Sequence, residues 1–167
     1  FRATHLVLPQ APETYEVVIS KSFWTWGAEI GFNEYGVAIG NEAVFTTLQH
    51  EEKRDGLMVI DMLRLGLERG KTAREAVEAI GAVVEAFGQG GNCELAGNSH
   101  FDGSCLIADP DEAWVIETAG RSWVAKRITD SIGSISNVLT IGSDYFSTDE
   151  LRRSLGISPG EGDVTSY

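Results

Sequence analysis

The chain has 167 residues, of which 43% are hydrophobic, and it carries a formal net charge of −12 at pH 7. This length fits one domain, and the hydrophobic fraction is sufficient for a core. The negative charge argues against nucleic acid and membrane surfaces as partners, because both attract basic patches. Cys93 and Cys105 have neither metal-site nor redox-pair spacing, so we expect no metal and no cofactor.

Two further features concern the compartment and the start of the chain. No apolar run is long enough to span a membrane, and the first residues lack the pattern of a signal peptide. Two thiols in a chain of this size favour a reducing compartment, and we expect the cytoplasm. Because the chain begins at Phe1 without a methionine, we interpret it as a fragment or a processed product.

The N-terminal third is predicted to be β-structure. Residues 4–8 and the β-branched stretch 14–21 are expected to form strands. Residues 22–47 are the most informative stretch and predict a hairpin, in which 33–36 (Asn-Glu-Tyr-Gly) has the composition of a turn. Apolar residues alternate before the turn at the period of a half-buried strand, namely at Ala28, Ile30 and Phe32.

The second hairpin strand is expected to end at Gly40-Asn41-Glu42. A glycine beside an amide lets a ligand approach the backbone closely. The Asn41 side chain offers an NH₂ donor and a carbonyl acceptor. Amide donors at a strand end commonly hold a developing oxyanion, which makes Asn41 a candidate catalytic residue. The alternative is an asparagine that only caps the turn.

Trp24 and Trp26 stand two residues apart before the hairpin. In an extended segment they would share one face, and they could form a wall of a substrate pocket. The alternative is a hydrophobic plug over the edge of the sheet.

Two helices are predicted to follow, over 55–70 and 72–88. The first has a broad apolar surface and ends at Gly70, and the second opens with a capping-box pattern at 72–75. The second helix repeats apolar residues along one face, at Ala73, Val77, Ile80, Val84 and Phe87. A short link between two helices indicates an antiparallel pair laid over a sheet.

A glycine-rich loop at 88–100 contains both Cys93 and His100. A thiol next to an imidazole suggests a nucleophile and its base. No third, orienting group is evident, and nothing in the sequence brings the two side chains together. Cys93 is therefore either a catalytic thiol or an ordinary loop cysteine, and the loop reading is favoured.

The C-terminal third is predicted to contain a meander of three strands, 104–108, 113–117 and 122–128. Asn137 follows within the apolar stretch 132–141, either as a turn asparagine or as a second site residue. A short helix is expected over 151–155, as the end of a domain covering 1–155, with 156–167 as a polar loop or tail. The order strands, helices, strands predicts an α+β fold, as half or more of a layered αββα sandwich. We expect two antiparallel sheets face to face, with the helix pair covering one of them.

Two stretches also resemble a known family. The sequence Trp-Gly-Ala-Glu-Ile-Gly-Phe-Asn-Glu-Tyr-Gly-Val-Ala-Ile-Gly-Asn-Glu-Ala-Val at 26–44 is similar to the central hairpin of the secernin and dipeptidase branch of the N-terminal-nucleophile (Ntn) hydrolases. These are relatives of penicillin V acylase and bile-salt hydrolase. The sequence Ser-Ile-Ser-Asn-Val-Leu-Thr-Ile at 134–141 resembles the same family. The resemblance extends from about Arg2 to Phe146.

The resemblance implies a four-layer αββα fold and an amide hydrolase with an N-terminal cysteine. In the family the thiol attacks the carbonyl and the free α-amino group serves as the base. By resemblance Asn41 and Asn137 hold the oxyanion or position the substrate. Phe1 carries no nucleophile, so the segment with the N-terminal Cys is expected to be missing ahead of it, and the resemblance also leaves a missing C-terminal part open. The isolated chain is therefore expected to hydrolyse neither dipeptides nor acylated amides.

Three functions stay open on the sequence. The first is a dipeptidase-like hydrolase of small peptides or acylated amides, in which the missing N-terminal segment is itself a partner. The second is a non-catalytic, secernin-like interaction or regulatory protein, and the third is a thiol hydrolase that uses Cys93 and His100. The oligomeric state is also open, and a homo-oligomer is included.

Overall fold

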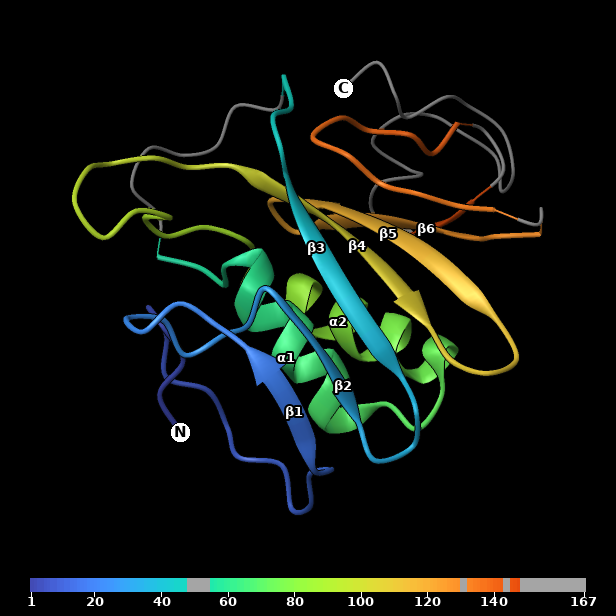
Figure 1. Ribbon diagram of the computed structural model, residues 1–167. Helices are drawn as coiled ribbons and strands as arrows, with labels where there is room; N and C mark the ends of the chain where they lie inside the picture. The colour runs from blue at the N-terminus through green and yellow to red at the C-terminus, as the bar shows by residue number, and fades with distance from the viewer. Residues whose placement is uncertain (48–54, 130–131, 143–144, 148–167) are drawn as a thin grey trace.

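The computed structural model describes residues 1–47, 55–129, 132–142 and 145–147 (Figure 1). The described strands form one antiparallel sheet of seven strands, whose spatial order is the order in the sequence. The strands are β1 (Val17–Ser20), β2 (Ile30–Asn33), β3 (Ala38–Val44), β4 (Asp102–Ala108), β5 (Ala113–Ala119), β6 (Ser122–Arg127) and β7 (Phe146–Ser147). The predicted hairpin and meander are confirmed.

Helices α1 (Val59–Arg69) and α2 (Ala73–Phe87) pack together on one face of this sheet (Figure 1). The predicted helix pair and the α+β class are confirmed. Thr72 caps α2 by accepting a hydrogen bond from Glu75 N (3.2 Å), and the Glu75 carboxylate accepts from Lys71 N (2.8 Å). The core between helices and sheet is made of fully buried aliphatic side chains, including Ile39, Leu63, Leu65, Leu67, Ile80, Ile107 and Ile116.

The link between the helices is short because α2 begins against the end of α1. A Cβ on Gly70 would lie 2.5 Å from Ala76 N, so a side chain at this position would collide with the first turn of α2. The glycine is therefore needed for a close approach, and its backbone is extended, with φ −104°.

The buried face of β2 is the reverse of what the apolar alternation suggested. Ile30 and Phe32 are 58% and 52% exposed, whereas Gly31 and Asn33 face α1 and are buried. Helix α1 comes so close that a Cβ on Gly31 would lie 2.9 Å from Leu67 Cδ1. The smallest residue of the strand must therefore point towards the helix, and the larger apolar residues are turned outward.

Asn33 joins the hairpin to the end of α1. It is 3% exposed, and its Nδ2 donates to the carbonyls of Leu67 (2.9 Å) and Gly70 (2.7 Å). Its Oδ1 accepts from the N–H groups of Tyr35 and Val37, both at 3.0 Å. One side chain therefore satisfies carbonyls that a helix end leaves without partners and also closes the turn.

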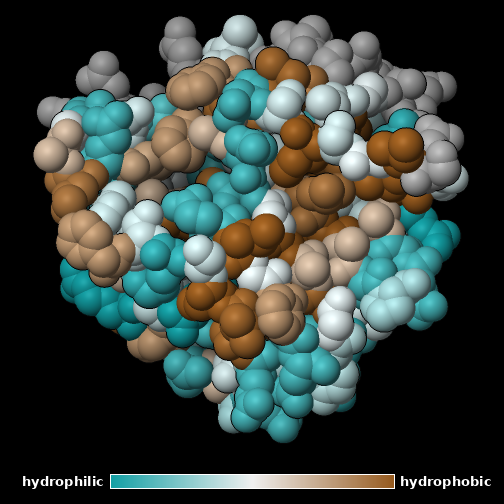
Figure 2. Space-filling model, in the orientation of Figure 1, coloured by the Kyte–Doolittle hydropathy of each residue, from teal (hydrophilic) through white to brown (hydrophobic). Residues whose placement is uncertain are grey.

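The described residues cover only part of the sheet face opposite the helices. Figure 2 shows hydrophobic surface across the middle of this view, where the sheet lies in front of the helices. Val18, Ile30 and Phe32 are exposed there on β1 and β2. The far end is covered by a small cluster, made of Val115, Val124, Ile141 and Tyr145. The predicted second sheet does not occur among the described residues.

Residues 4–8 do not form the predicted strand. The start of the chain is instead a tight loop, in which Arg2 and Val7 form an isolated bridge and Leu8 N donates to Phe1 O (2.9 Å). The hydroxyl of Thr4 donates to Asp61 Oδ1 in α1 (2.7 Å) and accepts from Trp26 N (3.0 Å), so tertiary contacts hold this segment as a loop.

Two expectations lie outside the described residues, namely the helix at 151–155 and the polar tail at 156–167. Within the part of the chain that the structure describes, no helix is long and apolar enough to cross a membrane.

Candidate active site

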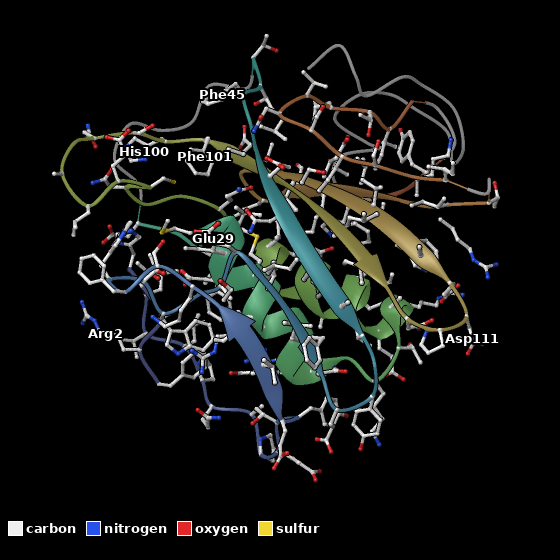
Figure 3. The ribbon with its side chains drawn as sticks, in the orientation of Figure 1. Arg2, Glu29, Phe45, His100, Phe101 and Asp111 are labelled. Atoms are coloured by element: carbon white, nitrogen blue, oxygen red, sulfur yellow. The ribbon has the colours of Figure 1, made fainter. Side chains whose placement is uncertain are left out.

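A cavity of about 520 Å³ lies at the end of β3, between the loop that precedes β2 and the glycine-rich loop that precedes β4. Its wall is partly apolar, with contributions from Trp24, Met58, Ile60, Cys93, Leu95 and Phe101. Glu29, just before β2, and Phe101, just before β4, both line this space and are labelled in Figure 3. The fold thus gathers residues that are distant in sequence around one opening.

Asn41 lines this cavity, but it lies within β3 and not at its end. The strand continues to Val44 because Asn41 still pairs with Cys105 of β4. The side-chain Nδ2 of Asn41 donates to Glu29 O (2.8 Å), which fixes the amide across the hairpin. One N–H of its NH₂ group is used in this bond, and the group has a second one.

Asn137 lines the same cavity from the opposite end of the chain. Its Nδ2 donates to Ala43 O (2.8 Å) and to Glu42 Oε2 (3.2 Å). Both N–H groups of this amide are thus engaged with β3. The structure brings Asn41 and Asn137 to one opening, and their roles stay a prediction.

The two tryptophans do not share a face. Trp24 lines the cavity. Trp26 packs on the Phe1 ring with centroids 5.0 Å apart and lies 4.2 Å from the Arg64 guanidinium. Residues 22–29 form no strand and include a turn at 23–24 and bends at 26–27 and 29, so the alternation of an extended segment does not apply to them. Trp24 is therefore among the residues that line the cavity, whereas Trp26 is not.

Cys93 and His100 do not form a catalytic pair. His100 is exposed (Figure 3), and its Nε2 lies 3.0 Å from Oδ1 of Asn98, two residues earlier in the loop. Cys93 lines the cavity, but its Sγ is directed to Gly91 O (3.6 Å). Burial raises the pKa of the Cys93 thiol, with smaller contributions from nearby carboxylates. A catalytic thiol requires the opposite shift.

We therefore expect Cys93 to alkylate slowly at pH 7. A raised pKa leaves less thiolate at neutral pH, so the rate with iodoacetamide should be lower than for free cysteine and should increase as the pH rises above 9. Cys105 is fully buried, with its pKa raised to about 12, and should react only after unfolding. The measurement is the alkylation rate by mass spectrometry at several pH values. Rapid labelling of Cys93 at pH 7 would restore the thiol-hydrolase hypothesis.

Three carboxylates line the cavity, namely Glu29, Glu42 and Glu94. No lysine, arginine or histidine occurs among the described residues that line it. The sequence reasoning did not select these residues, although the hairpin offered a signal. Because Ile30 pairs with Gly40, Glu29 stands opposite Asn41, and a strict hairpin register from the 33–36 turn would have placed it there.

Comparison with known proteins gives the chain its family. The sequence profile of peptidase family C69 matches residues 3–157. The chain belongs to peptidase family C69. It is also 28% identical over 149 residues to the "Probable dipeptidase A" of Streptococcus pyogenes serotype M3 (strain SSI-1) and to that of S. pyogenes serotype M1.

These matches confirm the resemblance to the dipeptidase branch. Each covers 83% of this chain but only 29% of the relative's length. The match to the C69 profile includes every residue that lines the cavity, from Ser22 to Asn137. Among the described residues, no group of three or more His, Cys, Asp or Glu side chains is arranged to hold a metal ion.

Proposed function

We propose that this chain is the central part of a dipeptidase-like amide hydrolase of the N-terminal-cysteine class, with its substrate in the cavity at the end of β3. The observation that carries the proposal is the arrangement of Asn41 and Asn137, which come from distant segments and line one opening. Membership of peptidase family C69 supports hydrolysis of a peptide bond. The nucleophile and its α-amino base would come from residues outside this chain.

Asn41 is the better-placed donor for an oxyanion. Its Nδ2 uses one N–H for Glu29 O, and the second can turn towards a substrate. Asn137 donates both N–H groups to β3, so it would have to exchange Glu42 for the substrate. The bond to Glu42 (3.2 Å) is longer than the bond to Ala43 O (2.8 Å), so we expect the substrate to replace Glu42.

The wall of the cavity supports a peptide with a free amino terminus. The three carboxylates give the opening a negative potential, which attracts an ammonium group and repels an additional carboxylate. The Trp24 and Phe101 rings offer apolar area for a side chain of the substrate. This lining favours a small peptide over an acylated amide, whose amino group carries no charge.

The exposed apolar part of the sheet face away from the helices supports the proposal that a second sheet completes the fold. Val18, Ile30 and Phe32 form an exposed apolar surface on the side away from the helices. An antiparallel sheet with apolar residues on both faces is suited to packing against a further layer. We therefore infer that a second sheet from the longer protein covers it and completes the four-layer αββα sandwich.

Both cysteines are free thiols, which supports a reducing, cytoplasmic location.

The function is tested by assaying the full-length protein on a dipeptide and on the same dipeptide with an acetylated amino group. We expect the free dipeptide to be hydrolysed with the higher kcat/KM. Glu29→Gln should raise KM for the free dipeptide by about two- to fivefold, the usual size of one exposed charge interaction, with little change in kcat.

Glu78→Gln is the matched control, because Glu78 lies on the exposed side of α2 in an ion pair with Arg74. It should leave KM unchanged. Equal turnover of the two substrates would contradict the selection of a free amino group. Absence of any turnover would instead favour a non-catalytic, secernin-like protein.

A further inference from the structure

Glu117 is a carboxylate enclosed on the sheet face away from the helices. It belongs to β5, is 2% exposed, and stands in a cross-strand row between Ser104 and Val124. Burial raises the pKa of Glu117, and hydrogen bonds from Thr140 and Ile141 partly oppose this. No cation of the described residues forms an ion pair with it. Burying a carboxylate costs free energy unless hydrogen bonds compensate it, so the partners of Glu117 indicate why the residue is tolerated here.

Among the described residues, the hydrogen-bond partners of the Glu117 carboxylate are two consecutive residues, Thr140 and Ile141. The carboxylate accepts from Thr140 N (2.5 Å), Thr140 Oγ1 (3.0 Å) and Ile141 N (3.4 Å). The Ile141 side chain is 1% exposed and packs in the cluster with Val115 and Val124. The Thr140–Ile141 segment is therefore fixed both by hydrogen bonds to Glu117 and by apolar packing of the Ile141 side chain.

Asn137 lies only three residues before this fixed step. Ser104 is the register partner of both Glu42 and Glu117, so the three side chains form one row across β3, β4 and β5. Asn137 bonds one end of the row, at Glu42, and Thr140 bonds the other end, at Glu117. Three residues span at most about 10 Å, so the chain between the two attachments has little slack.

We propose that Glu117 is a positioning residue that fixes the Thr140–Ile141 step and thereby holds the Asn137 amide at the cavity. The inference rests on the proposed function, because it assigns Asn137 a role in turnover. Glu117 itself is absent from the residues that line the cavity, so it acts through Asn137.

The first test compares kinetics of the full-length protein and its variants. Glu117→Gln keeps the shape but replaces one acceptor oxygen with an NH₂ group that faces N–H donors. We expect kcat to fall roughly tenfold, with KM within twofold of the original, since one hydrogen bond to a charged group is lost. Glu112→Gln is the matched control, because Glu112 begins the same hairpin but pairs with Arg127, and it should leave kcat unchanged.

Thr140 offers a second set of variants if Glu117→Gln fails to fold, because this residue is exposed. Thr140→Val removes one of the three donors to Glu117 and should lower kcat by a smaller factor. Thr140→Ser retains the hydroxyl and should restore the original kcat. An unchanged kcat in Thr140→Val together with Glu117→Gln would overturn the proposal.

The coupling between the two residues separates positioning from general damage. If Glu117 acts through Asn137, Glu117→Gln should cause no further loss of kcat in a protein that already carries Asn137→Ala. Fold-changes that multiply would overturn the proposal. If Asn137→Ala alone leaves kcat unchanged, the proposed function fails instead.

Hydrogen exchange tests the positioning role of Glu117 without an activity measurement. Exchange over 136–141, followed by mass spectrometry, should be about tenfold faster in Glu117→Gln, or in Thr140→Val if the former does not fold. It should be unchanged in Glu112→Gln. Unchanged exchange in the test variant would overturn the positioning role.

Discussion

Asn137→Ala is expected to lower kcat of the full-length protein by about 10²–10³, the usual effect of losing one oxyanion donor. The reason is that Asn137 brings an amide from a distant segment to the cavity that Asn41 also lines. KM should change little, because the donor acts mainly on charge that develops in the transition state. The measurement is steady-state hydrolysis of a dipeptide.

Asn98→Ala is the matched control for this variant. Asn98 is an exposed asparagine whose side chain bonds His100, and it is not among the residues that line the cavity. Its replacement should leave kcat unchanged. If Asn137→Ala lowers the stability of the protein but the folded fraction keeps the original kcat, Asn137 only attaches its segment to β3, and the site assignment is wrong.

Asn33→Ala should lower the free energy of unfolding of this chain by about 3–4 kcal/mol. The substitution removes four hydrogen bonds at a buried position and leaves the carbonyls of Leu67 and Gly70 without these partners. An unsatisfied buried polar group costs about 1–3 kcal/mol, and more than one is created here. Urea denaturation followed by tryptophan fluorescence measures the change.

Asn98→Ala serves again as the control, with an expected change within about 0.5 kcal/mol, as is usual at the surface. A loss below about 1 kcal/mol in Asn33→Ala would show that water replaces the missing partners. In that case the contact between the hairpin and the end of α1 would be less important than its geometry indicates.

The sequence by itself determined the elements whose signals are local. The helix at Ala73–Phe87 was predictable because its apolar residues repeat along one face and Thr72 caps it. The meander of β4, β5 and β6 was predictable because apolar strands alternate with short turns. The family was predictable from the stretches 26–44 and 134–141, and the match of peptidase family C69 over residues 3–157 confirms it.

Only the tertiary structure decided which face of an element is buried and which side chains meet. Period-two alternation cannot choose a face by itself, and the close approach of α1 made Gly31 rather than Ile30 the inward residue. Proximity in sequence likewise suggested a pair of Cys93 and His100, but the loop turns the imidazole to Asn98. The opposite holds for Glu117 and Thr140, which are distant in sequence and bonded in space. Such contacts depend on strand register and on the packing of layers, and neither is encoded in a local pattern.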